Sequence, residues 1–152
     1  ILDEGPSDEL IVQRGYKDAK GKLPIEDGIE VISVGLSHKR FLDLAIALQK
    51  RVWVIIDNDG KTLDQIRKRF EQYQNYHNVK IHTSDDPHLN TLEPNLVEAN
   101  DPEVLNKVLG TSFGKKEEIC EFMLANKTAA ALSIFESEFN IKMPKYIQDV
   151  FE

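Results

Sequence analysis

The sequence contains a single cysteine, Cys120, among its 152 residues, and this excludes an internal disulfide bond. It has no uncharged apolar stretch approaching the roughly 20 residues that a membrane span needs, so it predicts no membrane segment. It also lacks a glycine-rich phosphate loop and any Cys/His cluster with the spacing of zinc ligands. The scarcity of cysteine favours a reducing, cytoplasmic location.

Positive charge is also scarce, because 19 Lys and Arg residues face 26 Asp and Glu residues and the formal net charge is −7. A protein that binds nucleic acid through phosphate contacts alone is usually basic. The acidic balance therefore excludes a nucleic-acid-binding protein of this kind. If phosphates are the substrate, the positive charge must come from bound divalent cations, a local basic patch or another part of the protein. The chain opens with Ile1 and shows no signal-peptide pattern, so we expect a piece of a longer protein.

A hydrophobic fraction of 41% fits one globular domain with a real core. Short apolar runs alternate with amphipathic segments, which is typical of an α/β fold with a parallel sheet. The predicted strands are the end of a strand at Ile1 and Leu2, then Ile29–Val34, Val52–Ile56 and Val79–His82. The predicted helices are 7–20 with Ser7 as N-cap, 39–50, 63–76, 104–109, 115–124, 128–135 and 144–151. We expect an α/β core over 1–100 and a helical subdomain over 101–152, with Val52–Ile56 at the centre of the sheet.

Acidic residues follow two of the predicted strands. Glu4 comes after the first strand, and Asp57 and Asp59 come after the third. Ligands of open parallel sheets bind at the carboxyl ends of the strands, so these side chains would converge if the strands are neighbours. Asp8, at the start of the first helix, could point to the same place. Carboxylates that converge need a hard cation such as Mg²⁺ or Mn²⁺ to stay ionised together.

The same residues could also have ordinary structural roles. Asp8 is a common kind of residue at a helix N-terminus, and the Asp57–Gly60 segment could be a plain polar turn. The position of that turn, directly after the most buried strand, favours chemistry. The histidines have no spacing that suggests a metal site, and we expect them to be exposed or hydrogen-bonded. Cys120 is expected to be a core thiol.

An ordered set of short motifs resembles the Toprim domain of the OLD (overcoming lysogenization defect) nucleases, a family that includes the nuclease subunit of the Gabija antiphage system. The motifs are Glu4-Gly5-Pro6-Ser7-Asp8-Glu9-Leu10, Val34-Gly35-Leu36-Ser37, Ile56-Asp57-Asn58-Asp59-Gly60, Thr91-Leu92-Glu93-Pro94 and Asn126-Lys127-Thr128. The resemblance implies a Toprim fold and metal-dependent cleavage of DNA. It also implies an ABC-type ATPase, which would bind ATP in a part preceding this chain, and a homodimer or larger oligomer of the full-length protein.

The resemblance assigns roles to individual residues. Glu4, Asp57 and Asp59 would be catalytic acids that also bind Mg²⁺ or Mn²⁺, and two ions are expected. Asp8 and Glu93 would be further metal ligands. Lys127 would be the catalytic lysine of the helical segment. Two features differ from the family pattern: Asp3 stands where an apolar residue is usual, and the loop after Val34 is one residue short and has no Arg before its Gly.

Two other functions remain open. The run from Val52 to Gly60 also resembles the first motif of haloacid dehalogenase-like phosphatases, with Asp57 as nucleophile. That motif normally opens its domain and has Thr or Val directly after the Gly, whereas here Lys61 follows and 56 residues precede Asp57. The third possibility is a non-catalytic interaction module with a Toprim-like fold.

Overall fold

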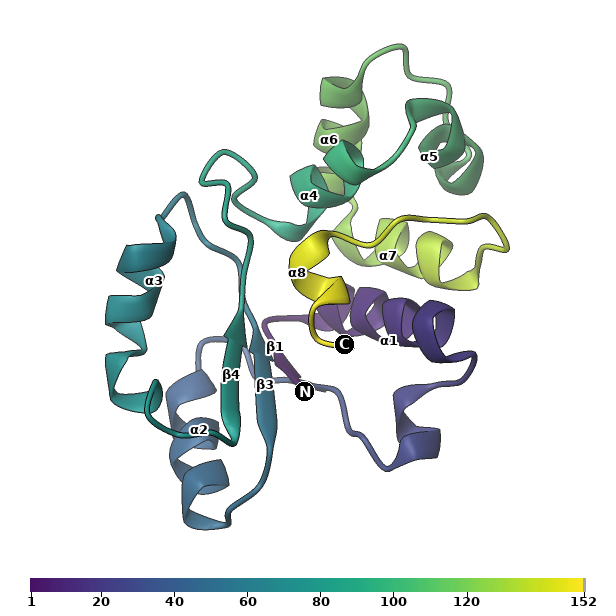
Figure 1. Cartoon of the computed structure of the whole chain (residues 1–152). Coiled ribbons are helices and arrows are strands. Elements are labelled where there is room, and N and C mark those ends of the chain that lie inside the picture. Colours follow the sequence, from purple (N-terminus) through teal and green to yellow (C-terminus); the bar gives the residue numbers. More distant parts are fainter. Residues whose placement is uncertain (152) are drawn as a thin grey trace.

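The chain folds around a parallel sheet, as a computed structural model that describes residues 1–151 shows (Figure 1). The strands are hydrogen-bonded in the order β2-β1-β3-β4, and every neighbouring pair is parallel. The elements are β1 (Leu2–Asp3), α1 (Pro6–Lys20), the 3-10 helix η1 (Pro24–Asp27), β2 (Ile32–Ser33), α2 (His38–Ala47), β3 (Val52–Ile55), α3 (Leu63–Arg69), the 3-10 helix η2 (Glu71–Tyr73), β4 (Val79–His82), α4 (Leu92–Ala99), α5 (Pro102–Leu109), α6 (Lys116–Ala125), α7 (Lys127–Glu136) and α8 (Lys145–Gln148). The predicted α/β fold and the interior position of β3 are confirmed.

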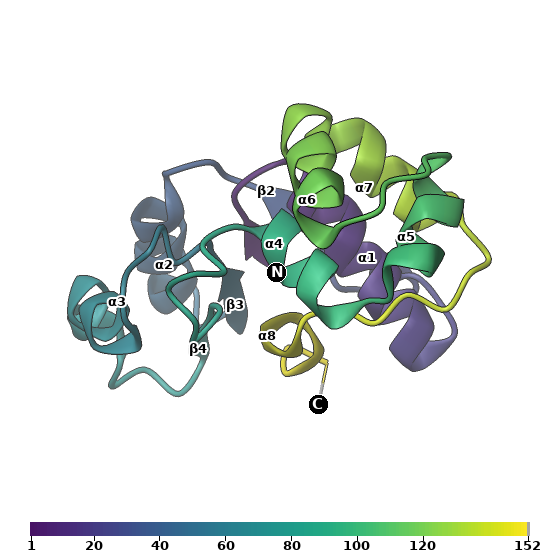
Figure 2. The same ribbon diagram turned by 90° about the horizontal axis from the view of Figure 1, so that it is seen from above.

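Helices cover both faces of the sheet because side chains alternate between the faces along β3. Val54 and Ile56 are buried in a cluster with residues of α2 and α3, whereas Ile55 belongs to a second cluster with residues of α1 and α8. Figure 1 shows α2 and α3 on one side of the strands and α1 and α8 on the other. The larger cluster continues into α4–α7, and Figure 2 shows these helices gathered over α1. Among residues 1–151, no helix is long and apolar enough to cross a membrane.

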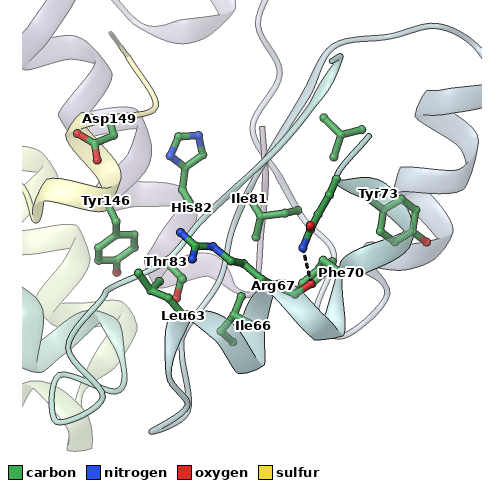
Figure 3. Close-up of a pocket in the computed structure, with 12 residues that line it drawn as sticks. Leu63, Ile66, Arg67, Phe70, Tyr73, Ile81, His82, Thr83, Tyr146 and Asp149 are labelled. Atoms are coloured by element: carbon green, nitrogen blue, oxygen red, sulfur yellow. Dashed lines mark hydrogen bonds between the residues drawn. The ribbon is translucent and has the colours of Figure 1, made fainter. Parts of the chain in front are cut away.

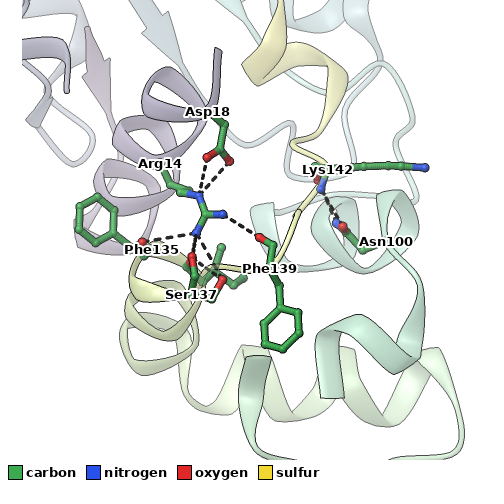
Figure 4. Close-up of polar contacts among 8 residues, drawn as sticks. Arg14, Asp18, Asn100, Phe135, Ser137, Phe139 and Lys142 are labelled. Carbon is green, nitrogen blue, oxygen red and sulfur yellow. Dashed lines mark hydrogen bonds and ion pairs between the residues drawn. The ribbon is translucent and has the colours of Figure 1, made fainter. Parts of the chain in front are cut away.

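A buried arginine joins α1 to the end of α7 (Figure 4). The guanidinium of Arg14 donates hydrogen bonds to the carbonyl oxygens of Ile134, Ser137 (2.7 Å) and Phe139 (2.8 Å), and to the carboxylate of Asp18 (2.8 Å). These carbonyl groups lie at and beyond the C-terminus of α7, where a helix lacks internal donors. Arg14 therefore fixes α7 against α1 and, with it, the position of Lys127 at the other end of that helix.

Several predicted elements differ from the structure in extent. The strand predicted at 29–34 is only Ile32–Ser33, and the helix predicted at 63–76 ends at Arg69 and continues as η2. The N-cap of α1 is Gly5, not Ser7, because Pro6 already occupies the first helical position. The prediction also missed α4, which carries Glu93. Pro94 is tolerated there because it lies in the first turn, where backbone N–H groups have no partner within the helix.

The buried face of α2 is not its most apolar one. Phe41, Leu44, Ala45 and Leu48 form an apolar stripe with helical spacing, but the helix buries His38, Leu42 and Ala45. Leu44 and Leu48 remain 55% and 59% exposed. Both stripes have helical spacing, so periodicity alone could not decide which of them faces the sheet.

Candidate active site

Glu4 and Asp8 lie where β1 passes into α1. Gly5 is the N-cap of this helix, and Asp8 is in its first turn, where the helix dipole favours a negative charge. A Cβ atom added to Gly5 would lie 3.7 Å from Oδ2 of Asp8, so the Asp8 carboxylate is folded back toward the end of β1. The turn therefore directs both carboxylates to the carboxyl edge of the sheet.

Asp57 and Asp59 lie in a tight turn after β3, and Asn58 fixes this turn. The Asn58 side chain is buried; its Nδ2 atom donates to the carbonyl oxygens of Ser84 (3.2 Å) and Asp86 (2.8 Å). Its Oδ1 atom accepts from the backbone N–H of Gly60 at 2.8 Å. Asp59 adopts a left-handed backbone conformation with φ of 52°, which Asp tolerates better than most residues. The Asp59 side chain is exposed and forms an ion pair with Lys61 at 3.1 Å.

Glu93 and Lys127 come from the helical part of the chain and complete the acidic cluster. Glu93 lies in the first turn of α4 with only 2% of its surface exposed, and the Thr91 hydroxyl donates to its Oε2 atom at 2.9 Å. The Lys127 ammonium, at the start of α7, lies 3.3 Å from the same oxygen. The Lys127 side chain is 47% exposed, so its charged end is also open to solvent.

The carboxyl groups of this cluster raise one another's pKa. Burial, followed by the charges of Asp8 and Glu4, raises the pKa of Asp57 to about 8. Burial and the neighbouring charges of Asp8 and Asp59 raise the pKa of Glu4 to about 7. Burial and the charge of Glu93 raise the pKa of Asp8 to about 6, against an opposing effect of Lys127. A divalent cation would reverse these shifts because it stabilises the ionised forms.

Asp3 is a further buried acid beside this cluster. It is fully buried in β1; the Ser33 hydroxyl donates to its Oδ1 atom at 2.7 Å. Its Oδ2 atom has no hydrogen-bond partner among residues 1–151. Burial raises the pKa of Asp3 to about 7, and the Ser33 hydrogen bond opposes the rise. The unusual acid at this strand position is therefore accommodated by a serine of the neighbouring strand.

The structure gathers all the residues that the sequence singled out. Glu4, Asp8, Asp57 and Glu93 lie close enough for their charges to act on one another, Asp59 lies near Glu4, and Lys127 lies at Glu93. Within residues 1–151, no group of three His, Cys, Asp or Glu side chains stands ready to hold a metal ion.

Sequence reasoning missed three residues near this cluster. The Arg69 charge, from the end of α3, lowers the pKa of Glu4, and Asn58 holds the acidic turn. Tyr146, from α8, is buried and lies close enough to Asp57 and Asp8 for their charges to raise its pKa, after the larger effect of burial. No sequence signal points to Arg69 or Tyr146, because both approach the cluster only through tertiary folding. Asn58 could have been noticed as an Asx turn residue.

The expectation for the histidines is only partly right. His77 and His88 are exposed, but His38 is 1% exposed and neither ring nitrogen has a hydrogen-bond partner in the described part of the chain. Burial, with a smaller effect of the Arg69 charge, lowers the pKa of His38. The first turn of α2 accepts this ring because a neutral imidazole is much less costly to bury than a charged one.

A comparison with known protein families finds a match, which includes both acidic turns of the candidate site. Residues 1–59 match the family described as "overcoming lysogenization defect protein-like, TOPRIM domain". No curated protein and no solved structure matches the chain. The matched segment contains Glu4 and Asp8 at the first turn and Asp57 and Asp59 at the second. Over residues 1–59, the chain is thus similar to the Toprim domain of the OLD family.

Proposed function

We propose that the chain is the catalytic part of a metal-dependent DNA endonuclease. The observation that carries the proposal is the convergence of partly buried acids from the ends of β1 and β3 with the buried Glu93 of α4, with one lysine beside them. The family match supports it, because Toprim domains have nuclease-type roles and generally bind a divalent metal. An acidic chain could then act on DNA because cations would supply the missing positive charge.

The donor atoms of the cluster fit Mg²⁺ or Mn²⁺. All of them are carboxylate oxygens, which these hard cations prefer, and the raised pKa of Asp57 indicates a place where negative charge lacks a partner. We infer that Glu4, Asp8, Asp57, Asp59 and Glu93 would hold the metal, with two ions expected. Bound ions of this kind supply an activated water and stabilise the leaving oxygen in phosphodiester hydrolysis.

Lys127 is proposed to be a catalytic residue that contacts the scissile phosphate. Its ammonium lies 3.3 Å from Oε2 of Glu93, so it is held at the edge of the acidic cluster. Its partial exposure leaves room for a phosphate oxygen to approach. A cation placed there would neutralise charge that develops on the phosphoryl group during hydrolysis.

The setting in a longer protein is also a proposal. By resemblance to the family, the chain would act with an ATP-binding ABC-type ATPase part, in a homodimer or larger oligomer, on DNA in the cytoplasm. A role in antiphage defence follows from the resemblance to the Gabija nuclease. We further propose that residues 1–100 form the Toprim core and that 101–152 form a helical subdomain that supplies Lys127.

Plasmid nicking by the 152-residue chain tests this proposal. We expect supercoiled DNA to be nicked with Mg²⁺ or Mn²⁺ and to stay intact in EDTA, and Asp57→Ala to abolish nicking. Asp64→Ala, which removes an exposed acid on α3, is the matched control and should cut normally. A chain that leaves DNA intact but hydrolyses small phosphomonoesters would support the phosphatase alternative, and a chain that does neither would support the interaction module.

A further inference from the structure

A hollow lies beside the candidate active site, between α3, β4 and α8 (Figure 3). Its volume is about 370 Å³. Known ligand pockets measure roughly 300–1,000 Å³, so the hollow suits one small ligand. A second hollow of about 400 Å³ adjoins it and shares several lining residues. The shared residues are Leu63, Thr83, Tyr146 and Asp149.

Strand pairing places the hollow one strand away from Asp57. The backbone N–H of Ile56 donates to the carbonyl oxygen of His82 at 3.1 Å, so Thr83 after β4 is level with Ile56, the residue that precedes Asp57. Tyr146 links the two places. It lines the hollow, and it also lies within reach of the charges of the acidic cluster. A ligand in the hollow would therefore lie next to anything bound at the carboxylates.

The walls of the hollow combine an apolar floor with a polar rim. Ile66 and Phe70 are almost fully buried, and Ile81 of β4 is partly buried beside them. The hydroxyl oxygen of Thr83 is closed off from solvent and has no hydrogen-bond partner within residues 1–151. Rotation of this side chain would offer a polar contact to a ligand. Such walls suit a flat heterocycle, which has apolar faces and a polar edge.

The charges around the rim favour a neutral ligand over a phosphate group. Arg67 is already paired with Asp64 at 3.2 Å, and Asp149 adds a negative charge to the lining. In the lining of this hollow, a phosphate group would meet this acid without an unpaired lysine or arginine opposite it. An uncharged base has no such conflict.

We propose that this hollow receives the base of a nucleotide adjoining the scissile phosphate. The inference rests on the proposed nuclease function and names its substrate class: DNA in which a base can leave the stack, such as single-stranded, gapped or frayed DNA. Unstacking a base costs least in such substrates, so the hollow would select them. Arg67 and Tyr146 would contact the base, and the carboxylates would serve the phosphate next to it.

Binding of free nucleosides to the metal-free chain tests this assignment without any cleavage. In EDTA, saturation-transfer NMR should show saturable binding of deoxyadenosine or thymidine through the base protons, and no binding of 2-deoxyribose. Leu63→Trp, which fills the hollow, should weaken the binding at least about fivefold, as expected for lost stacking contacts. Lys68→Gln, on the same helix but outside the lining, should leave the binding unchanged.

Thr83→Val provides a second variant that keeps the shape of the side chain. We expect it to weaken nucleoside binding while the melting temperature stays near that of the parent chain. Equal binding of 2-deoxyribose, or unchanged nucleoside binding in both Leu63→Trp and Thr83→Val, would overturn the assignment. Because no metal or DNA is present, this failure is distinct from a failure of the plasmid assay, which would count against the nuclease function.

Discussion

At the scale of single residues, Asp57 is the group whose ionisation most affects the candidate site. Its carboxyl group is partly buried beside other acids, and its pKa is raised from 3.8 to about 8. At a pH between these two pKa values, the carboxyl group of Asp57 is ionised in the unfolded chain but keeps its proton in the folded chain. The folded state therefore binds more protons, and the contribution to stability is present below pH 4 and lost as the pH rises through about 8.

Asp57→Asn should therefore remove part of the loss of stability that the parent chain shows as the pH rises, because asparagine does not ionise. In EDTA at pH 8 we expect the variant to melt roughly 2–4 °C higher than the parent chain, which is about 1 kcal/mol for a chain of this size. At pH 5, which is closer to the pKa of 3.8 in the unfolded chain, the gap should be much smaller. Differential scanning calorimetry at both pH values measures the difference. Asp64→Asn, at an exposed acid, should match the parent at both, and a difference that is equal at pH 5 and pH 8 would contradict the assigned pKa.

Lys127 offers a residue test with a close internal control. Lys127→Ala should slow DNA nicking about a hundredfold to a thousandfold, the typical loss for one electrostatic contact in the transition state. Metal affinity should change little, because a lysine does not ligate a cation. Lys116 also begins a helix and pairs with a glutamate of α4, Glu98, at 3.2 Å. Lys116→Ala should nick DNA normally, whereas parent-like nicking by Lys127→Ala would remove Lys127 from the mechanism.

At the scale of elements, the turn after β3 depends on a side chain that does no chemistry itself. Asn58 ties the turn to the loop that follows β4, so the directions of Asp57 and Asp59 depend on this amide. Without it, buried carbonyl groups would lose their donor, at a cost of about 1–3 kcal/mol for each group left unpaired. The turn is thus both a structural and a functional element.

Asn58→Ala should lower the free energy of unfolding by about 2–3 kcal/mol and weaken Mn²⁺ binding together with it. Urea denaturation and metal titration of the same preparation measure the two effects. The control is Asn78→Ala, because Asn78 also donates to a backbone carbonyl, that of Lys50 at 2.8 Å, but this hydrogen bond is exposed to solvent. Loss of stability with normal Mn²⁺ affinity in Asn58→Ala would show that the turn does not position the ligands.

The contact between α1 and α7 leads to a second prediction at this scale, which concerns the stability of the chain. Arg14→Met should cost about 2–4 kcal/mol of stability, since the carbonyl groups at the end of α7 and Asp18 would lose a buried partner. Lys17→Met, three residues further along the same helix and exposed, should change the stability by less than about 0.5 kcal/mol. Thermal denaturation compares them. Equal melting temperatures would show that Arg14 is dispensable for the packing of α7.

How far the sequence predicts these elements depends on how local their signals are. The apolar run of β3 and the glycine and proline at the ends of α1 are local signals, and both elements appear close to their predicted ranges. The buried face of α2 depends on which stripe meets the sheet. The helix around Glu93 contains Pro94 and was not recognised. Acids after strands were predicted from position alone, but Arg69 and Tyr146 reach them only in the folded chain.

At the scale of the whole molecule, two parts of the chain share the candidate site. The family match ends at residue 59 and includes the carboxylates after β1 and β3. Glu93 and Lys127 come from helices that pack over α1, and Arg14 holds one of those helices in place. The chain as a whole is acidic, with a net charge of −7, so the proposed activity depends on cations that offset this charge at the site.

The most direct measurement of this claim is calorimetric titration of Mn²⁺ into the whole chain at pH 7 in buffers of different ionisation enthalpy. Because the pKa values of Asp57 and Glu4 are raised to about 8 and about 7, binding of the cation should release protons. We predict saturable binding whose heat depends on the buffer. We expect Asp57→Ala to lose both the binding and the buffer-dependent heat. No binding, or binding that is unchanged in Asp57→Ala, would contradict the account.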